Sequence, residues 1–279
     1  MYEQFYGFRE KPFSMLPDPA FLYVGRQHRH ALTLLEYALT EGSSFALITG
    51  EIGSGKTTLI RRILAQRDRP VTFGLITNTS SRMQGLMPWV AQSLGVTASG
   101  VPPAELHEKL LERLVDEYRG GRRVVIVVDE AQNLNAAALE ELRVLSNLNC
   151  DKDLLLQTVL VGQPELRDTL RHPSLNQLAQ RIAIDYHLKS LPRAETHAYV
   201  RHRLRIAGGS PEIIESPAIE LVHHYSCGVP RLINVLCDTA LVYGFAEQVR
   251  SIGTELVAQV IRDRRAGGIL PLAMTPADA

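Results

Sequence analysis

The chain has 279 residues, of which 45% are hydrophobic and 22% charged, and its formal net charge is zero. This composition is typical of a folded globular protein and excludes a disordered or collagen-like chain. The length favours one large α/β domain together with a smaller second one. The protein therefore lacks the overall positive charge that is typical of proteins that bind nucleic acid nonspecifically.

Local basic patches could still contact DNA, so DNA is a candidate partner that the sequence does not favour. Solvated helix faces are the alternative explanation for each patch. The candidate arginines form three groups: Arg61, Arg62, Arg67 and Arg69; Arg201, Arg203 and Arg205; and Arg262, Arg264 and Arg265.

The cysteines and histidines suggest neither a disulfide framework nor a zinc site. Cys150, Cys227 and Cys237 are odd in number and lack metal-ligand spacing, which favours a reducing compartment. We expect the histidine pairs 28/30 and 223/224 to lie at the surface or at interfaces. No apolar run approaches the roughly 18 residues of a membrane span, and the N-terminus does not resemble a signal peptide. We therefore expect a cytoplasmic protein that a partner could hold at the inner membrane.

The N-terminal segment, residues 2–23, is unusually aromatic. It contains seven of the 16 phenylalanines and tyrosines in the chain (seven Phe plus nine Tyr), together with Pro12, Pro17 and Pro19. We expect it to lie extended across the main domain. Two roles remain open for its rings: packing, or contact with the base of a nucleotide.

Residues 50–57 read Gly-Glu-Ile-Gly-Ser-Gly-Lys-Thr, a full match to the phosphate-binding P-loop (Walker A motif). A helix is expected before it at 28–41, a buried strand at 44–49 and a second helix at 57–64. An accidental glycine loop is the alternative. In a P-loop, Lys56 reaches the β and γ phosphates of ATP and the Thr57 hydroxyl holds Mg²⁺. The expected phosphate-binding residues are Gly50, Glu51, Ile52, Gly53, Ser54, Gly55, Lys56, Thr57 and Thr58.

A strand is expected next at 71–76, followed by helices at 82–94 and 104–118 on either side of a Gly-Pro break. Residues 124–128 are a continuous Val/Ile run that ends in Asp129 and Glu130. This pattern is typical of a Walker B strand, which delivers carboxylates to the ligand edge of a parallel sheet. Asp129 is expected to bind Mg²⁺ and Glu130 to deprotonate the attacking water. Two solvated acids at a strand end are the alternative.

Two more strands are expected, at 154–162 ending beside Gln163, and at 182–188 preceded by Arg181. From residue 192 onward the pattern is helical, with helices at 192–207, 216–226, 230–248 and 254–264. We therefore predict an N-terminal segment (1–27), a P-loop α/β ATPase domain (28–190), a helical lid (191–265) and a tail (266–279). No internal repeat is evident.

This arrangement resembles the AAA+ ATPases over nearly the whole chain, which implies a five-stranded parallel sheet flanked by helices and a small all-helical C-terminal lid. The resemblance implies that Gln163 positions the water, as sensor 1. It implies that Arg181 is an arginine finger for a neighbouring subunit, in a homo-oligomer with shared ATP sites; a surface arginine is the alternative. Arg231, in Gly228-Val229-Pro230-Arg231, matches sensor 2, although proline and arginine there could also serve only as a helix cap.

Several motifs are similar to the A-type ATPase of the bacterial general secretion pathway. The resemblance implies ATP-driven assembly or conformational change of an unidentified partner complex. It covers the ATPase part of such proteins, which usually continue into a membrane span and a periplasmic part. A transposon-type DNA-binding regulator and a weakly hydrolysing, nucleotide-gated binding module are the alternatives. The motifs are residues 5–14, 17–19 and 21–23, the P-loop, Asp129 to Leu134, and Val161 to Leu166.

Overall fold

The computed structural model describes residues 1–16, 18–65, 70–77, 79, 85–150 and 153–267. These form two compact units. The first contains residues 1–29, 51–59 and those from 189 onward, and the second contains residues 30–50 and 60–188. The helices α2 (Arg26–Glu41) and α3 (Lys56–Leu64) each begin in the first unit and end in the second.

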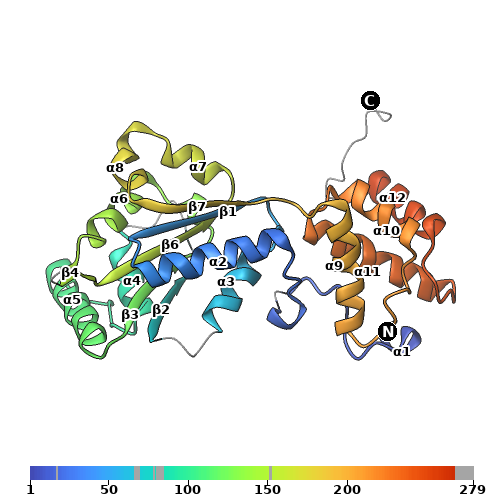
Figure 1. Ribbon diagram of the computed structural model, residues 1–279, viewed down its shortest axis with the longest axis horizontal. Helices are drawn as coiled ribbons and strands as arrows, with labels where there is room; N and C mark the ends of the chain where they lie inside the picture. The colour runs from blue at the N-terminus through green and yellow to red at the C-terminus, as the bar shows by residue number, and fades with distance from the viewer. Residues whose placement is uncertain (17, 66–69, 78, 80–84, 151–152, 268–279) are drawn as a thin grey trace. The chain divides into compact units, whose positions relative to one another are not determined.

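The second unit is built on a five-stranded parallel sheet, as the sequence predicts (Figure 1). The strands follow the spatial order β2-β3-β6-β1-β7, and all four neighbouring pairs are parallel. The three inner strands β3, β6 and β1 are rich in Val, Ile and Leu and almost fully buried, because both of their faces are covered, whereas the edge strands β2 and β7 are partly exposed. The strands are β1 (Phe45–Gly50), β2 (Val71–Ile76), β3 (Arg123–Val128), β6 (Leu156–Gly162) and β7 (Ile182–Leu188).

Helices cover both faces of this sheet (Figure 1). The helices α2 and α3 lie over one face. On the other face, α4 (Met87–Ser93), α5 (Pro103–Arg119) and α6 (Ala136–Leu145) share an apolar core with alternate strand residues such as Leu47, Ile126 and Leu160. Two short helices, α7 (Glu165–Leu170) and α8 (Asn176–Ala179), precede β7.

All but two of the expected helix and strand boundaries agree with the structure to within two residues. The strand expected from residue 154 begins at Leu156, because Asp153–Leu154 (β5) pairs antiparallel with Asn149–Cys150 (β4). The helix expected at 82–94 begins at Met87 in the described part; residues 82–84 lie outside it. Helix α12 extends three residues further than predicted, to Gly267.

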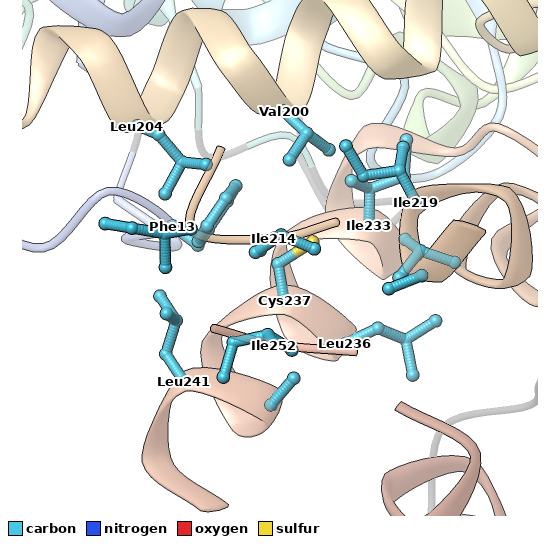
Figure 2. Packing of buried hydrophobic residues seen from close by; sticks show 14 of the residues in the cluster. Phe13, Val200, Leu204, Ile214, Ile219, Ile233, Leu236, Cys237, Leu241 and Ile252 are labelled. Atoms are coloured by element: carbon cyan, nitrogen blue, oxygen red, sulfur yellow. The ribbon is translucent and has the colours of Figure 1, made fainter. Parts of the chain in front are cut away.

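The first unit contains the predicted C-terminal helices: α9 (Arg193–Ile206), α10 (Ser216–Ser226), α11 (Pro230–Ala246) and α12 (Thr254–Gly267). Their apolar faces form one core, in which Leu204, Ile214, Ile233 and Leu241 are fully buried (Figure 2). Among the helices that the structure describes, none combines the length and apolar composition needed to cross a bilayer.

The aromatic N-terminal segment belongs to this helical core. We expected its rings to lie across the main domain, but those of Tyr2, Tyr6, Phe8, Phe13 and Phe21 are buried in the core of the C-terminal helices. Figure 2 shows Phe13 among their aliphatic side chains. The segment also forms the short helix α1 (Glu3–Tyr6) and the single turn η1 (Pro19–Phe21). Burial of these large rings provides apolar area that the helices alone would lack.

Polar contacts fix the N-terminal segment on those helices. The Tyr2 hydroxyl donates a hydrogen bond to the Asp238 carboxylate, and burial together with this bond raises the pKa of Tyr2. The guanidinium of Arg203 is buried, and it donates to the backbone carbonyls of Pro12 (2.5 Å) and Ser14 (3.2 Å). The segment is therefore an integral part of the helical unit.

Candidate nucleotide-binding and hydrolysis site

The P-loop runs from the end of β1 to the start of α3 and has the backbone that its glycines allow. Gly53 and Gly55 have φ angles of 80° and 99°, a region that side chains disfavour. The Ser54 N–H donates to the Glu51 carbonyl at 3.1 Å, and the Lys56 ammonium donates to the same oxygen at 2.9 Å. Lys56 is only 6% exposed, so its charge lies within the loop.

Arg231 lies directly against this loop. Its backbone N–H donates to the Gly53 carbonyl at 3.2 Å, and a β-carbon added to Gly53 would collide with the Arg231 side chain. The preceding turn is fixed by the Leu191 N–H, which donates to the Gly228 carbonyl at 2.9 Å. Pro230 occupies the first turn of α11, a position that favours proline. The start of α11 therefore combines a capping proline with an arginine that contacts the P-loop.

His28 was not predicted as a site residue, yet it contacts the P-loop. We expected a surface or interfacial histidine, but His28 is 4% exposed, and a β-carbon on Gly55 would lie 2.9 Å from its Nε2. Burial lowers the pKa of His28, against the opposing effect of the Glu195 carboxylate. Glu195 in turn accepts a 2.8 Å hydrogen bond from the Arg26 N–H at the start of α2. Sequence spacing gives no signal for this contact.

The loop residues fit a phosphate group. The Ser54 hydroxyl is buried, and it has no hydrogen-bond partner among the described residues. The Lys56 ammonium, the glycine N–H groups and the N-terminus of α3 supply the positive charge that phosphate oxygens need. Thr57, one residue further along α3, carries a hydroxyl of the type that binds Mg²⁺ in such loops.

The acidic residues Asp129 and Glu130 lie in the second unit, at the end of β3. The Asp129 carboxylate is 5% exposed and accepts a 2.9 Å hydrogen bond from the Glu130 N–H. Glu130 itself has a φ of 54°, a left-handed conformation that a non-glycine residue rarely adopts. The Thr79 hydroxyl donates to the Glu130 carbonyl at 2.8 Å, which helps to hold this backbone. Such strain is typical of functional sites.

Two amides hold the Glu130 carboxylate. The Nε2 of Gln132 donates to it at 2.6 Å, and the Nε2 of Gln163 lies 3.4 Å from the same oxygen. The Gln132 carbonyl oxygen accepts a 3.0 Å hydrogen bond from the Gln163 N–H, which links the ends of β3 and β6. The structure therefore brings Glu130 and Gln163 together, and it adds Gln132. The sequence did not identify Gln132 as a site residue, because its position beside Glu130 in the motif does not show which groups its side-chain amide contacts.

Arg181 has contacts within its own chain. Its guanidinium donates to the Ser146 hydroxyl at 2.8 Å and lies 3.4 Å from the Arg143 carbonyl. These two hydrogen bonds go to the end of α6 and not to Glu130. Asn135, another polar residue near β3, caps α6 by accepting from the Ala138 N–H at 2.8 Å.

Several arginines of the candidate basic patches have structural roles. Arg203 is buried, so the prediction of a basic patch or a solvated face is wrong for that residue. Arg201 pairs with Glu212 at 3.2 Å, and the Arg265 guanidinium lies 4.8 Å from the centre of the Tyr225 ring. Arg67 and Arg69 lie outside the described residues. Cys227 and Cys237 are free thiols.

Comparison with known proteins supports the assignment of the chain to the AAA+ family. A family model described as an AAA domain matches residues 39–170. General secretion pathway protein A of Aeromonas hydrophila is 42% identical over 247 residues, which cover 88% of this chain and 45% of that protein. The chain is an AAA+ protein that resembles the secretion-pathway A type. It spans somewhat less than half the length of this relative.

Solved structures of low sequence identity share the AAA+ fold. The ORC2 protein of Aeropyrum pernix, solved in ADPNP and ADP complexes, is 19% identical with a TM-score of 0.68, covering 92% of this chain and 72% of that one. Drosophila ORC bound to DNA is 18% identical with a TM-score of 0.65, covering 96% and 67%. The Thermotoga maritima RuvB branch migration motor is 20% identical with a TM-score of 0.56, covering 88% and 72%. At these identities the likeness shows the fold alone.

Proposed function

We propose that this AAA+ protein hydrolyses ATP with Mg²⁺ and uses the reaction to assemble or reshape a partner complex related to secretion or the cell envelope. The observation that carries the proposal is the carboxylate of Glu130, held by the amides of Gln132 and Gln163 at the end of β3. In the parallel sheet, the carboxyl end of β3 lies at the same edge as that of β1, where Gly50 begins the P-loop.

In this proposal the P-loop binds the phosphates through its backbone N–H groups and the Lys56 ammonium. Thr57 and Asp129 would hold Mg²⁺, which neutralises charge on the phosphate oxygens when bound. Glu130 takes the proton of the attacking water, while Gln132 and Gln163 fix the direction of its carboxylate. Gln132 is thus a positioning residue. Arg231 stabilises the γ-phosphate within the same subunit.

We further propose that the active form is a homo-oligomer in which Arg181 completes the ATP site of a neighbouring subunit. An arginine supplied in this way stabilises charge that develops in the transition state. Resemblance to General secretion pathway protein A favours a secretion-related protein partner and a cytoplasmic location, where ATP is available. DNA is a weaker candidate, since Arg203 is buried and Arg201 is paired with an acid.

The first test measures ATP turnover per subunit over a wide range of protein concentrations, at saturating ATP and Mg²⁺. Turnover should rise with protein concentration if neighbouring subunits complete the site. Lys56→Ala should greatly weaken ATP binding, whereas Glu130→Gln should bind ATP and stall hydrolysis. Retained turnover in Glu130→Gln would overturn the assignment of the base. Bound ATP with near-zero turnover at every concentration would instead favour a nucleotide-gated binding module.

A further inference from the structure

The buried ring of His28 is hydrogen-bonded to the backbone of the P-loop. Burial lowers the pKa of His28, whereas the Glu195 carboxylate and a hydrogen bond to the Ser54 backbone oppose this shift. A hydrogen bond that favours the protonated ring is one that the ring donates, so the Ser54 carbonyl is its acceptor. The Nδ1 atom has no partner among the described residues, and Nε2 would lie 2.9 Å from a β-carbon on Gly55. Nε2 is therefore the atom that faces the loop.

This hydrogen bond also fixes the direction of the next N–H group in the loop. In a planar trans peptide group the C=O and the N–H point in opposite directions. Since the Ser54 carbonyl points toward His28, the Gly55 N–H points away from it. That N–H donates to no other group in the described part of the chain. Glycine N–H groups of this kind bind phosphate oxygens, so His28 orients a donor that a bound phosphate requires.

Glu195, in the first turn of α9, holds the turn of α2 that carries His28. Its carboxylate accepts a 2.8 Å hydrogen bond from the Arg26 N–H, as an acidic cap does at a helix N-terminus. The backbone of Gly25 lies so near that a β-carbon there would be 2.5 Å from the Oε2 atom of Glu195. The same carboxylate is close enough for its charge to act on the His28 ring. Glu195 therefore joins α9 to the start of α2 beside the P-loop.

We propose that His28 is a positioning residue for phosphate binding and that Glu195 sets its place, so that α9 acts on the P-loop through His28. This inference rests on the proposed function, because it concerns the same ATP site. His28 acts through the loop backbone and not on the phosphates themselves. The Arg231 N–H holds the preceding carbonyl, that of Gly53, at 3.2 Å. Residues of α2 and α11 thus fix two successive peptide groups of the loop.

The test measures binding of a nonhydrolysable ATP analogue with Mg²⁺ to the full chain by calorimetry, and turnover at saturating ATP. His28→Leu removes the donor and should weaken binding of the analogue about tenfold, because a misdirected Gly55 N–H loses much of a hydrogen bond to a charged group. The value of kcat should fall by no more than about threefold, since loss of binding common to the ground state and the transition state raises KM and spares kcat.

A conservative variant and a control separate positioning from packing. His28→Gln can still donate from its Nε2 atom, so it should recover most of the affinity for the analogue. His30→Leu, at an exposed position of α2, should bind the analogue as the wild type does. Urea unfolding checks that each variant folds. If His28→Leu does not fold, His28→Ala replaces it, because alanine removes the donor without adding a branched side chain.

Glu195→Ala tests whether α9 acts through His28. It should weaken binding of the analogue by about three- to tenfold. The double variant with His28→Leu should bind no more weakly than His28→Leu alone, because the effects of residues that act through one another do not add. Additive losses would overturn the role of Glu195.

Two results would overturn the role of His28. One is wild-type affinity for the analogue in a folded His28→Leu or His28→Ala, and the other is a loss in His28→Gln as large as in the variants without a donor. These binding measurements do not require hydrolysis. A wild type that binds the analogue without turnover would therefore contradict the proposed hydrolysis alone, whereas a wild type that does not bind it would overturn both proposals.

Discussion

The side chain of Gln132 bridges the proposed base and the strand beside it: its amide nitrogen donates to the Glu130 carboxylate at 2.6 Å, and its oxygen accepts from the Gln163 N–H at 3.0 Å. A β-carbon on Gly162 would lie 2.8 Å from that oxygen, so the space around the bridge is small. The direction of the Glu130 carboxylate thus depends on a residue that would not touch ATP.

Gln132→Ala should lower kcat about 10- to 100-fold, because a misdirected base loses much of its effect. ATP affinity should stay within about twofold, since positioning of the base acts on the transition state. Steady-state turnover and equilibrium ATP binding measure the two effects. Asn133→Ala, at the exposed next position, is the matched control and should behave as the wild type. Equal losses in kcat and ATP affinity would make Gln132 a structural residue only.

Gly53→Ala should disrupt the P-loop beyond the effect of backbone strain. Gly53 and Gly7 have similar φ angles of 80° and 77°, but only an alanine at Gly53 would collide with Arg231. Backbone strain alone should cost each variant about 1–2 kcal/mol in free energy of unfolding, the usual penalty for a side chain in the left-handed region, and Gly53→Ala should lose more because of the collision. Only Gly53→Ala should also weaken ATP binding, by about tenfold or more. Equal ATP affinity in the two variants would remove the Arg231 contact from the proposed site.

The sheet and its motifs could be predicted because they depend on local sequence. The strands β2 and β7 begin and end at the predicted residues, since each is an extended run between clear breaks. The P-loop and the Asp129-Glu130 pair are likewise defined by residues adjacent in the chain. The helix α6 was not predicted, although its Ala- and Leu-rich sequence has high helix propensity.

Contacts between distant segments could not be predicted. The aromatic pattern of residues 2–23 requires burial but does not identify the surface that covers the rings, which is that of the C-terminal helices. His28 shows the same limit, because its contact with Gly55 bridges the start of α2 and the P-loop.

Phe13→Ala should strongly destabilise the helical unit. The ring is 1% exposed and lies in the core with Leu204 and Leu241 (Figure 2). Removal of a buried phenylalanine side chain usually costs about 3–5 kcal/mol, because it leaves a cavity. Leu16→Ala is the control within the same segment, since Leu16 is 78% exposed. Urea unfolding compares the two; similar small losses would mean that the segment is not part of the folding unit.

Arg181→Ala should remove the dependence of turnover on protein concentration while leaving ATP affinity nearly unchanged. A finger supplied by a neighbour stabilises transition-state charge and contributes little to binding in the ground state. Ser146→Ala is the control for the structural role of Arg181, because it removes the 2.8 Å hydrogen bond from Arg181 to Ser146 and leaves the charge of Arg181 in place. We expect Ser146→Ala to retain concentration-dependent turnover. If the two variants lose turnover and stability in parallel, Arg181 serves its own chain and not its neighbour.

His28 should make the stability of the protein depend on pH. Burial lowers the pKa of His28 below its ordinary value of 6.5, although the nearby Glu195 carboxylate opposes this shift. The unfolded chain therefore binds more protons than the folded protein as the pH falls below 6.5. The contribution of neutral His28 to the free energy of unfolding is fully present above pH 6.5. It is lost as the pH falls toward the lowered pKa of His28 in the folded protein.

His28→Gln should reduce this acid sensitivity, because glutamine stays neutral. The free energy of unfolding is measured in urea at about pH 7.5 and about pH 5.5, which bracket the ordinary pKa of histidine. The drop between the two pH values should be smaller in His28→Gln than in the wild type. His202 and His223, whose pKa values burial also lowers, remain in both proteins, so their contributions cancel in the comparison. His30→Gln, at an exposed position of α2, should keep the wild-type drop. If the free energy of unfolding falls equally in His28→Gln and in the wild type, protonation of His28 does not destabilise the folded protein.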